Sequence, residues 1–162
     1  MDFFYPNYIN DMWRIFGICL YGDPMRFVDE QQRTFRLDDI QTMLKERGVG
    51  LYDTATVVRR TRNTASDKDL EVLEITDFDT LLRSAPECCA VVTTGQKATD
   101  LFAAHYGLSH PAMGQYVEFP FDGRSLRFYR MPSSSRAYPM RLARKAEAYQ
   151  PLFDEFIKSK KS

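Results

Sequence analysis

Three consecutive serines near the C-terminus are the residues whose type and spacing most directly indicate chemistry. They stand in MPSSSRAYPM, residues 131–140, with Arg136 directly after them. Several hydroxyls and a guanidinium at one junction can bind the oxygens of a phosphate group. A simpler interpretation is that one hydroxyl caps the following helix, with Pro139 in its first turn. Capping accounts for one serine and leaves two for phosphate binding.

Other cations that could contact an anion follow two apolar segments. Arg59, Arg60 and Arg62 lie in the polar stretch RRTRNTASD, and Lys97 follows a turn at Gly95. Each cation that neutralises a phosphate would make binding weaker at high salt. Exposed loop arginines without a ligand are equally common, so both interpretations stay open.

The cysteines and histidines favour neither a metal site nor a disulfide framework. Cys19, Cys88 and Cys89 are an odd set without C-x-x-C spacing. His105 and His110 are most simply a helix-end residue and a loop residue. A serine hydrolase is disfavoured, because no G-x-S-x-G elbow is present and neither histidine has a compelling position.

Composition indicates a globular protein with a polarised charge distribution. The chain has 162 residues, 44% of them apolar, which is enough for a core. No apolar stretch could span a membrane and no leader follows Met1, so we expect a cytoplasmic protein without a membrane partner. Residues 1–123 carry 12 Lys+Arg and 19 Asp+Glu, whereas residues 124–162 carry 10 and 3. The basic C-terminal part is either an anion-binding face or a solvated helix.

Apolar periodicity predicts the elements that position these residues. Helices are expected at 10–20, 37–47, 69–86 (one broken or two short), after Gly95, and at about 140–158. Strands are expected at 49–54, 90–94 and 126–131, with hairpins in 26–36 and near Asp122–Gly123. This alternation indicates an α/β fold with a mainly parallel sheet. Ligands bind beyond the C-terminal ends of such strands, where Tyr52–Thr56, Thr93–Lys97 and Met131–Tyr138 should gather.

The serine segment and three other stretches resemble, in order, motifs of the uracil-DNA glycosylase superfamily. MPSSSRAYP is similar to its C-terminal motif, and FFYPNYINDMW to the aromatic-rich segment before the first helix. GVGLYDTATVVRRTRNTASD resembles the second strand with its exit loop, and AVVTTGQKATDLF the third strand with its turn into a helix. The similarity is closest to the mismatch-specific thymine/uracil and hypoxanthine-removing branches and covers nearly the whole chain. It implies a single domain over residues 1–162, a three-layer sandwich in which helices flank a short, mainly parallel central sheet.

The resemblance implies a monofunctional DNA glycosylase acting in base excision repair. Such an enzyme flips a deaminated base, such as uracil or hypoxanthine, out of double-stranded DNA and hydrolyses its N-glycosidic bond with water. It needs no cofactor and no metal, and we expect a monomer. In family terms Ser133, Ser134 and Ser135 grip phosphates, and Arg136 or Tyr138 fills the gap left by the base. The alternatives are a degenerate relative that binds DNA without cleaving it and, less favoured, a small serine hydrolase.

The base pocket implied by the resemblance begins with aromatic residues near the N-terminus. Phe3, Phe4 and Tyr5 match the position where the family stacks an aromatic ring on the flipped base. Alternatively these rings fill the core beside Trp13. Asn10 matches an asparagine before the first helix, and capping of that helix is the stronger interpretation.

Asp53 is the candidate catalytic residue, with Tyr52 beside it in the implied pocket. The family carries a base-contacting asparagine here in one branch and an aspartate in the other. An ionised carboxylate only accepts hydrogen bonds, so it would stabilise the cationic sugar of an oxocarbenium-like transition state, or contact the base edge if protonated. A structural role for Asp53 at the strand end is the alternative.

The first motif of the superfamily, a strand followed by a turn such as G-x-N-P-G or G-S-F-P, does not occur in this sequence. The chain therefore resembles an N-terminally truncated member whose central first strand is missing. Either the reading frame starts upstream of Met1, or the protein has lost part of its active site. If the chain begins at Met1, we expect strands 49–54 and 90–94 either to leave a gap or to pair directly. Low stability or self-association should follow, because an unfilled slot exposes backbone hydrogen-bonding groups.

Overall fold

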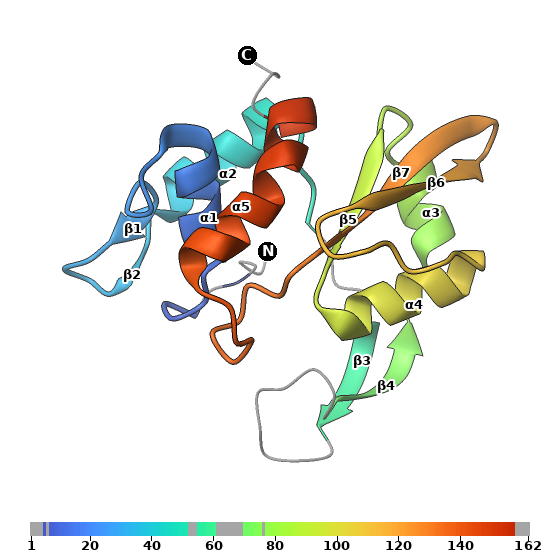
Figure 1. Cartoon of the computed structure of the whole chain (residues 1–162), viewed down its shortest axis with the longest axis horizontal. Coiled ribbons are helices and arrows are strands. Elements are labelled where there is room, and N and C mark those ends of the chain that lie inside the picture. Colours follow the sequence, from blue (N-terminus) through green and yellow to red (C-terminus); the bar gives the residue numbers. More distant parts are fainter. Residues whose placement is uncertain (1–4, 6, 52–54, 61–69, 76, 158–162) are drawn as a thin grey trace. The chain divides into compact units, whose positions relative to one another are not determined.

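The chain folds into two compact units, and it passes between them twice. The first unit comprises Met1–Tyr52 and Ser134–Ser162, and the second comprises Asp53–Ser133. The structure, a computed structural model, describes residue 5 and residues 7–51, 55–60, 70–75 and 77–157, with 55–60 and 70–75 described by their backbone alone (Figure 1). No helix in these ranges is long and apolar enough to cross a bilayer. The expectation of one domain over residues 1–162 stays a prediction.

The first unit is mainly helical. It contains α1 (Met12–Tyr21), α2 (Leu37–Arg47), α5 (Leu142–Leu152), the π-helical turn η2 (Phe153–Ile157), and a hairpin of β1 (Val28–Asp29) and β2 (Thr34–Phe35). Helices α1 and α5 lie side by side (Figure 1). Trp13 is fully buried, and the rings of Phe16 and Phe153 meet edge to face at 4.8 Å. The predicted helices at 10–20, 37–47 and the C-terminus, and the hairpin in 26–36, are confirmed.

The prediction of a strand at 49–54 is wrong for its described residues. Residues 49–51 form no regular structure, and the next strand, β3, spans Ala55–Arg60. The reason lies in the end of α2. Gly48 adopts a left-handed conformation with φ 69°, and the N–H of Val49 donates to the carbonyl of Leu44 at 2.9 Å. This Schellman-type closure uses the Val49 N–H for the helix end instead of a strand ladder.

Strand β3 pairs antiparallel with β4 (Leu70–Ile75), where the sequence predicted helix. The two acidic residues of LEVLEI, Glu71 and Glu74, stand three positions apart, a spacing that favours a helix, so pairing with β3 overrides the local pattern here. Only the second half of the predicted region is helical, as α3 (Phe78–Arg83), which starts where the Asp77 carboxylate accepts the Thr80 N–H at 3.1 Å. Arg59 and Arg60 belong to β3 and not to a loop, and Arg62 lies outside the described residues.

The second unit contains a three-stranded sheet in the order β5-β7-β6. Strand β5 (Ala90–Thr94) runs parallel to β7 (Arg124–Met131), and β6 (Tyr116–Phe121) runs antiparallel to β7. The β6–β7 turn is the predicted one: Asp122 and Gly123 both have positive φ, as tight hairpin turns require. The α/β class is confirmed, but this sheet is mixed, whereas a mainly parallel one was predicted.

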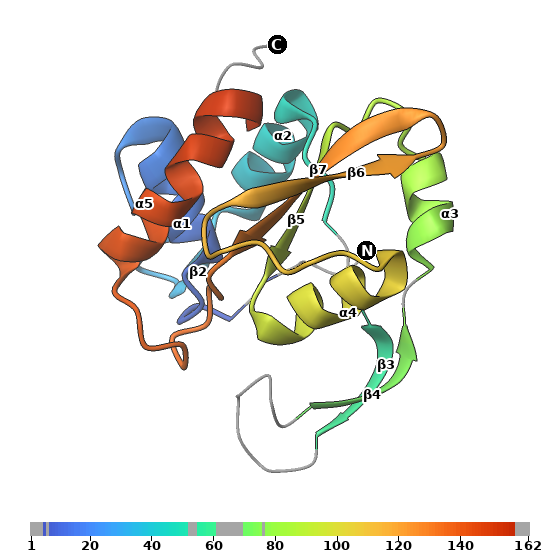
Figure 2. The ribbon, with the colours of Figure 1, turned by 45° about the vertical axis from the view of Figure 1, so that its right-hand side comes forward.

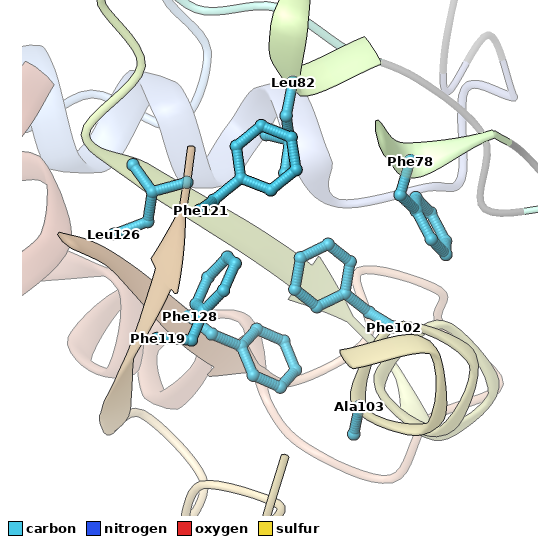
Figure 3. Packing of buried hydrophobic residues seen from close by; sticks show 8 residues of the cluster. All are labelled: Phe78, Leu82, Phe102, Ala103, Phe119, Phe121, Leu126 and Phe128. Atoms are coloured by element: carbon cyan, nitrogen blue, oxygen red, sulfur yellow. The ribbon is translucent and has the colours of Figure 1, made fainter. Parts of the chain in front are cut away.

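One face of this sheet carries the core of the second unit. Helices α3 and α4 (Gln96–Tyr106) supply Phe78, Leu82, Phe102 and Ala103, which pack on Phe119, Phe121, Leu126 and Phe128 of β6 and β7 (Figure 3). Phe102 lies at the centre, with its ring centroid 4.8 Å from that of Phe128 and 5.1 Å from that of Phe78. These rings hold α4 against β6 and β7, and the end of β7 forms part of the candidate site.

The predicted strands at 90–94 and 126–131 share a sheet. Strand β3, which follows the predicted strand region 49–54, does not join that sheet. In the described part of the chain, β5 pairs with β7, and β3 pairs with β4 in a separate sheet. Direct pairing of the 49–54 region with 90–94 is not seen among these residues. The three-layer arrangement and the missing first strand stay predictions.

Candidate nucleic-acid interface

The C-terminal ends of β5 and β7 meet at one edge of the sheet. Thr94 is paired with Met131, and the Gly95 N–H donates to the Met131 carbonyl at 3.2 Å. Gly95 has φ 91° and ψ 165°, a conformation that is essentially restricted to glycine, and α4 begins at the next residue (Figure 2). Two of the three segments predicted to gather at this edge thus meet there. The third begins at Tyr52–Asp53, outside the described residues.

Polar side chains at the start of α4 form a network that the sequence did not predict. Arg130 donates to the side-chain oxygen of Gln96 at 3.0 Å, and Gln96 donates to Asp100 at 2.8 Å. His110 also contacts Asp100, at 2.8 Å. Burial raises the pKa of Asp100, but hydrogen bonds from His110 and Gln96 outweigh it, so the pKa is lowered. Lys97, a predicted phosphate contact, lies on the same turn and adds to this lowering.

Backbone carbonyls of the serine segment accept several hydrogen bonds. Ser134 is 2% exposed, and its carbonyl accepts the Asp11 N–H at 2.9 Å. The carbonyl of Ser135 accepts the Tyr138 N–H at 3.0 Å and Nζ of Lys145 at 2.9 Å. Ser133 and Ser135 are half-buried.

The interpretation that a serine caps the last helix is wrong. Helix α5 starts at Leu142, and its N-cap is Arg141, which makes no side-chain capping bond. The Ser135 hydroxyl instead accepts the Ala137 N–H at 3.1 Å within its own turn. Pro139 precedes the helix and does not stand in its first turn.

Asp11 ties the serine segment to two helices, and sequence reasoning missed it. One carboxylate oxygen accepts Nε of Arg136 at 3.1 Å, and the other accepts Nζ of Lys145 at 3.2 Å. Lys145 is 0% exposed and the Asp11 side chain 6%, whereas Arg136 is 49% exposed. Asp11 stands 134 positions from Lys145 in the chain, so no spacing signal could have revealed the pair.

The structure describes part of the implied base pocket. The ring of Tyr5 meets Trp13 edge to face at 6.1 Å, as the core interpretation predicts. The side-chain oxygen of Asn10 accepts the N–H of Met12, the first residue of α1, at 2.9 Å, although the N-cap residue of the helix is Asp11. Phe3, Phe4, Tyr52 and Asp53 lie outside the described residues, as do the side chains of Arg59 and Arg60.

Both histidines contact aspartates. His105 lies 3.3 Å from Asp79, which also accepts the Tyr106 hydroxyl at 2.7 Å. The hydrogen bond from Tyr106, followed by that from His105, lowers the pKa of Asp79. Within the described ranges, neither His105 nor His110 contacts a serine, as a hydrolase triad would require.

No protein-family model, curated protein or solved structure matches this chain. The similarity to the uracil-DNA glycosylase superfamily therefore remains a prediction from the four motifs.

Proposed function

We propose that this protein is a DNA glycosylase that hydrolyses the N-glycosidic bond of a deaminated base, uracil or hypoxanthine, in double-stranded DNA. The observation that carries the proposal is the meeting of the β5 and β7 ends. It brings two motif segments, Thr93–Lys97 and the start of the serine segment, to one edge of the sheet. That edge is where α/β proteins bind ligands.

The groups at this edge suit a phosphodiester backbone. Helix α4 begins there, with free N–H groups in its first turn, and carries Lys97. Ser133 lies two residues after Met131, the last residue of the neighbouring strand β7. In this proposal Ser133 and Ser135 contact phosphates, while the buried Ser134 fixes the backbone between them. Asp53 stabilises the sugar cation formed as the base departs, and water is the nucleophile. The three-layer sandwich of the family is the fold we propose.

The second candidate is a protein of the same fold that binds DNA without cleaving it. The observation that favours it is that hydrogen bonds from Asp11, Tyr138 and Lys145 fix the backbone of the serine segment, and DNA binding alone requires no more than this. Incubation with duplexes containing uracil or hypoxanthine, followed by alkaline cleavage at abasic sites, separates the two. Abasic sites support the glycosylase. Binding of both duplexes without abasic sites rejects it in favour of the second candidate.

A further inference from the structure

Two cations share one carboxylate at the serine segment. Asp11 accepts Nε of Arg136 with one oxygen and Nζ of Lys145 with the other, at 3.1 and 3.2 Å. The cluster of Asp11, Lys145 and Arg136, the Asp11 cluster, therefore carries one net positive charge. An unbalanced cation near the protein surface attracts an anion.

Burial decides which member presents that charge. Lys145 is 0% exposed and also donates to the carbonyl of Ser135, so its charge is directed at protein oxygens. Arg136 is 49% exposed and belongs to the same segment as the three serines. The excess charge of the Asp11 cluster is therefore accessible to a ligand through Arg136.

The contact with Asp11 also orients the guanidinium. Within the described part of the chain, the single hydrogen bond of the Arg136 side chain is the one from Nε. The end-on fork of the planar guanidinium, one N–H from each terminal nitrogen, is directed away from an acceptor at Nε and matches two oxygens of a phosphate. A guanidinium fixed at Nε loses little further freedom when it binds such a group.

We infer that Arg136 is a receptor for one phosphate group of the DNA backbone, positioned by Asp11 and Lys145. The identity of the phosphate as DNA rests on the proposed function. The role differs from that of a residue filling the gap left by the flipped base. In this role Arg136 keeps its contact with the buried carboxylate of Asp11 and binds the phosphate through its terminal nitrogens.

The test of Arg136 as a phosphate receptor is a binding assay with a short fluorescein-labelled duplex that contains no damaged base. Fluorescence anisotropy measures Kd at a series of NaCl concentrations. Arg136→Ala should raise Kd roughly tenfold, because a charge-assisted contact is lost. It should also lower the slope of log Kd against log salt by about 0.9, the loss of one phosphate contact. The matched control is Arg144→Ala on α5, an exposed arginine paired with exposed Glu147. It should change Kd less than about twofold. Equal effects of the two variants, or an unchanged slope for Arg136→Ala, would overturn the inference.

Arg136→Lys tests the positioning by Asp11. Lysine keeps the charge but has neither Nε nor the planar fork, so Kd should approach that of Arg136→Ala. If Arg136→Lys binds like the parent, charge alone suffices and the positioning role of Asp11 is rejected. Both substitutions are at a half-exposed side chain, and far-UV circular dichroism checks that the variants are folded.

A titration with inorganic pyrophosphate separates this inference from the proposed function. The NMR signal of the Arg136 Nε–Hε group reports binding. If pyrophosphate shifts this signal while no duplex binds, Arg136 is a phosphate receptor and the proposed function on DNA is rejected. If the duplex binds equally to the parent and to Arg136→Ala, the role of Arg136 as a phosphate receptor is rejected and the proposed function is retained. If neither probe binds the parent protein, both fail.

Discussion

Replacement of Lys145 by methionine tests whether the Asp11 cluster holds the first unit together. Methionine has a similar shape, so the change mainly removes the ammonium. Two contacts are lost, to Asp11 at 3.2 Å and to the Ser135 carbonyl at 2.9 Å. Asp11, whose side chain is 6% exposed, then keeps Arg136 as its one ion-pair partner in the described part of the chain.

The expected loss in the free energy of unfolding follows from the fact that Asp11 loses one of its two ion-pair partners. Removing one member of a buried ion pair costs about 3–5 kcal/mol, and the remaining Arg136 contact places Lys145→Met at the low end, about 3 kcal/mol. For a chain of this size the melting temperature should fall by roughly 6–12 °C. Urea unfolding followed by circular dichroism measures the free energy of unfolding.

Two further variants make the result interpretable. Arg144→Met, on the same helix but at a 68% exposed side chain, should change the free energy of unfolding by less than about 0.5 kcal/mol. Asp11→Asn combined with Lys145→Met removes both charges and should recover at least about 1 kcal/mol relative to Lys145→Met alone. A loss below about 1 kcal/mol in Lys145→Met, or no recovery in the double variant, would refute the reasoning.

Four other outcomes are expected. Phe102→Ala should lower the free energy of unfolding by about 3–5 kcal/mol in urea titrations, because a ring at the centre of the second core is removed; a loss under 1 kcal/mol would contradict that packing. Gly95→Ala should cost about 1–3 kcal/mol, since φ 91° with ψ 165° strains any other residue, and unchanged stability would argue against this turn. Tyr106→Phe should lower the melting temperature at neutral pH. The hydrogen bond from Tyr106, with that from His105, lowers the pKa of Asp79 below its ordinary value of 3.8. The stabilisation by Tyr106 should therefore be lost as the pH falls below 3.8 and Asp79 is protonated. A difference in melting temperature that does not depend on pH would exclude this linkage. Replacing Ser133 and Ser135 together with alanine should weaken duplex binding by about 1 kcal/mol per lost hydrogen bond, whereas unchanged affinity would restrict the segment to a structural role.

The sequence predicted the elements with strong local signals. Helix ends at Gly22 and Gly48, the Asp122–Gly123 turn and the strand before Gly95 are each determined by a few neighbouring residues, although β5 is not the buried strand that its apolar residues suggested. The prediction of a helix over residues 70–75 was wrong because LEVLEI is short. Its strand partner, β3, lies in a segment whose pairing no local pattern reveals. Local signals were also misleading at 49–51, where apolar residues suggested a strand but closure of α2 used the backbone.

The meeting of two strand ends at the candidate site was predicted, but the contacts that support the serine segment were not. The meeting of Gly95 and Met131 follows from the rule that parallel strands end at one edge. Asp11 and Lys145 carry no motif, since a buried ion pair depends on how distant helices pack and not on spacing. The same holds for the contact between His110 and Asp100, which joins α4 to the loop after it.

Direct detection of released free base tests the central claim most closely. Duplexes containing one uracil or one hypoxanthine are incubated with excess protein, and the free base is quantified by liquid chromatography with mass detection. The parent protein should release at least one of the two bases. Asp53→Asn should either slow release from both duplexes, if Asp53 stabilises the sugar cation, or shift the preference towards uracil, if it reads the base edge. Release of neither base by a parent protein that binds both duplexes would contradict the assignment as a glycosylase.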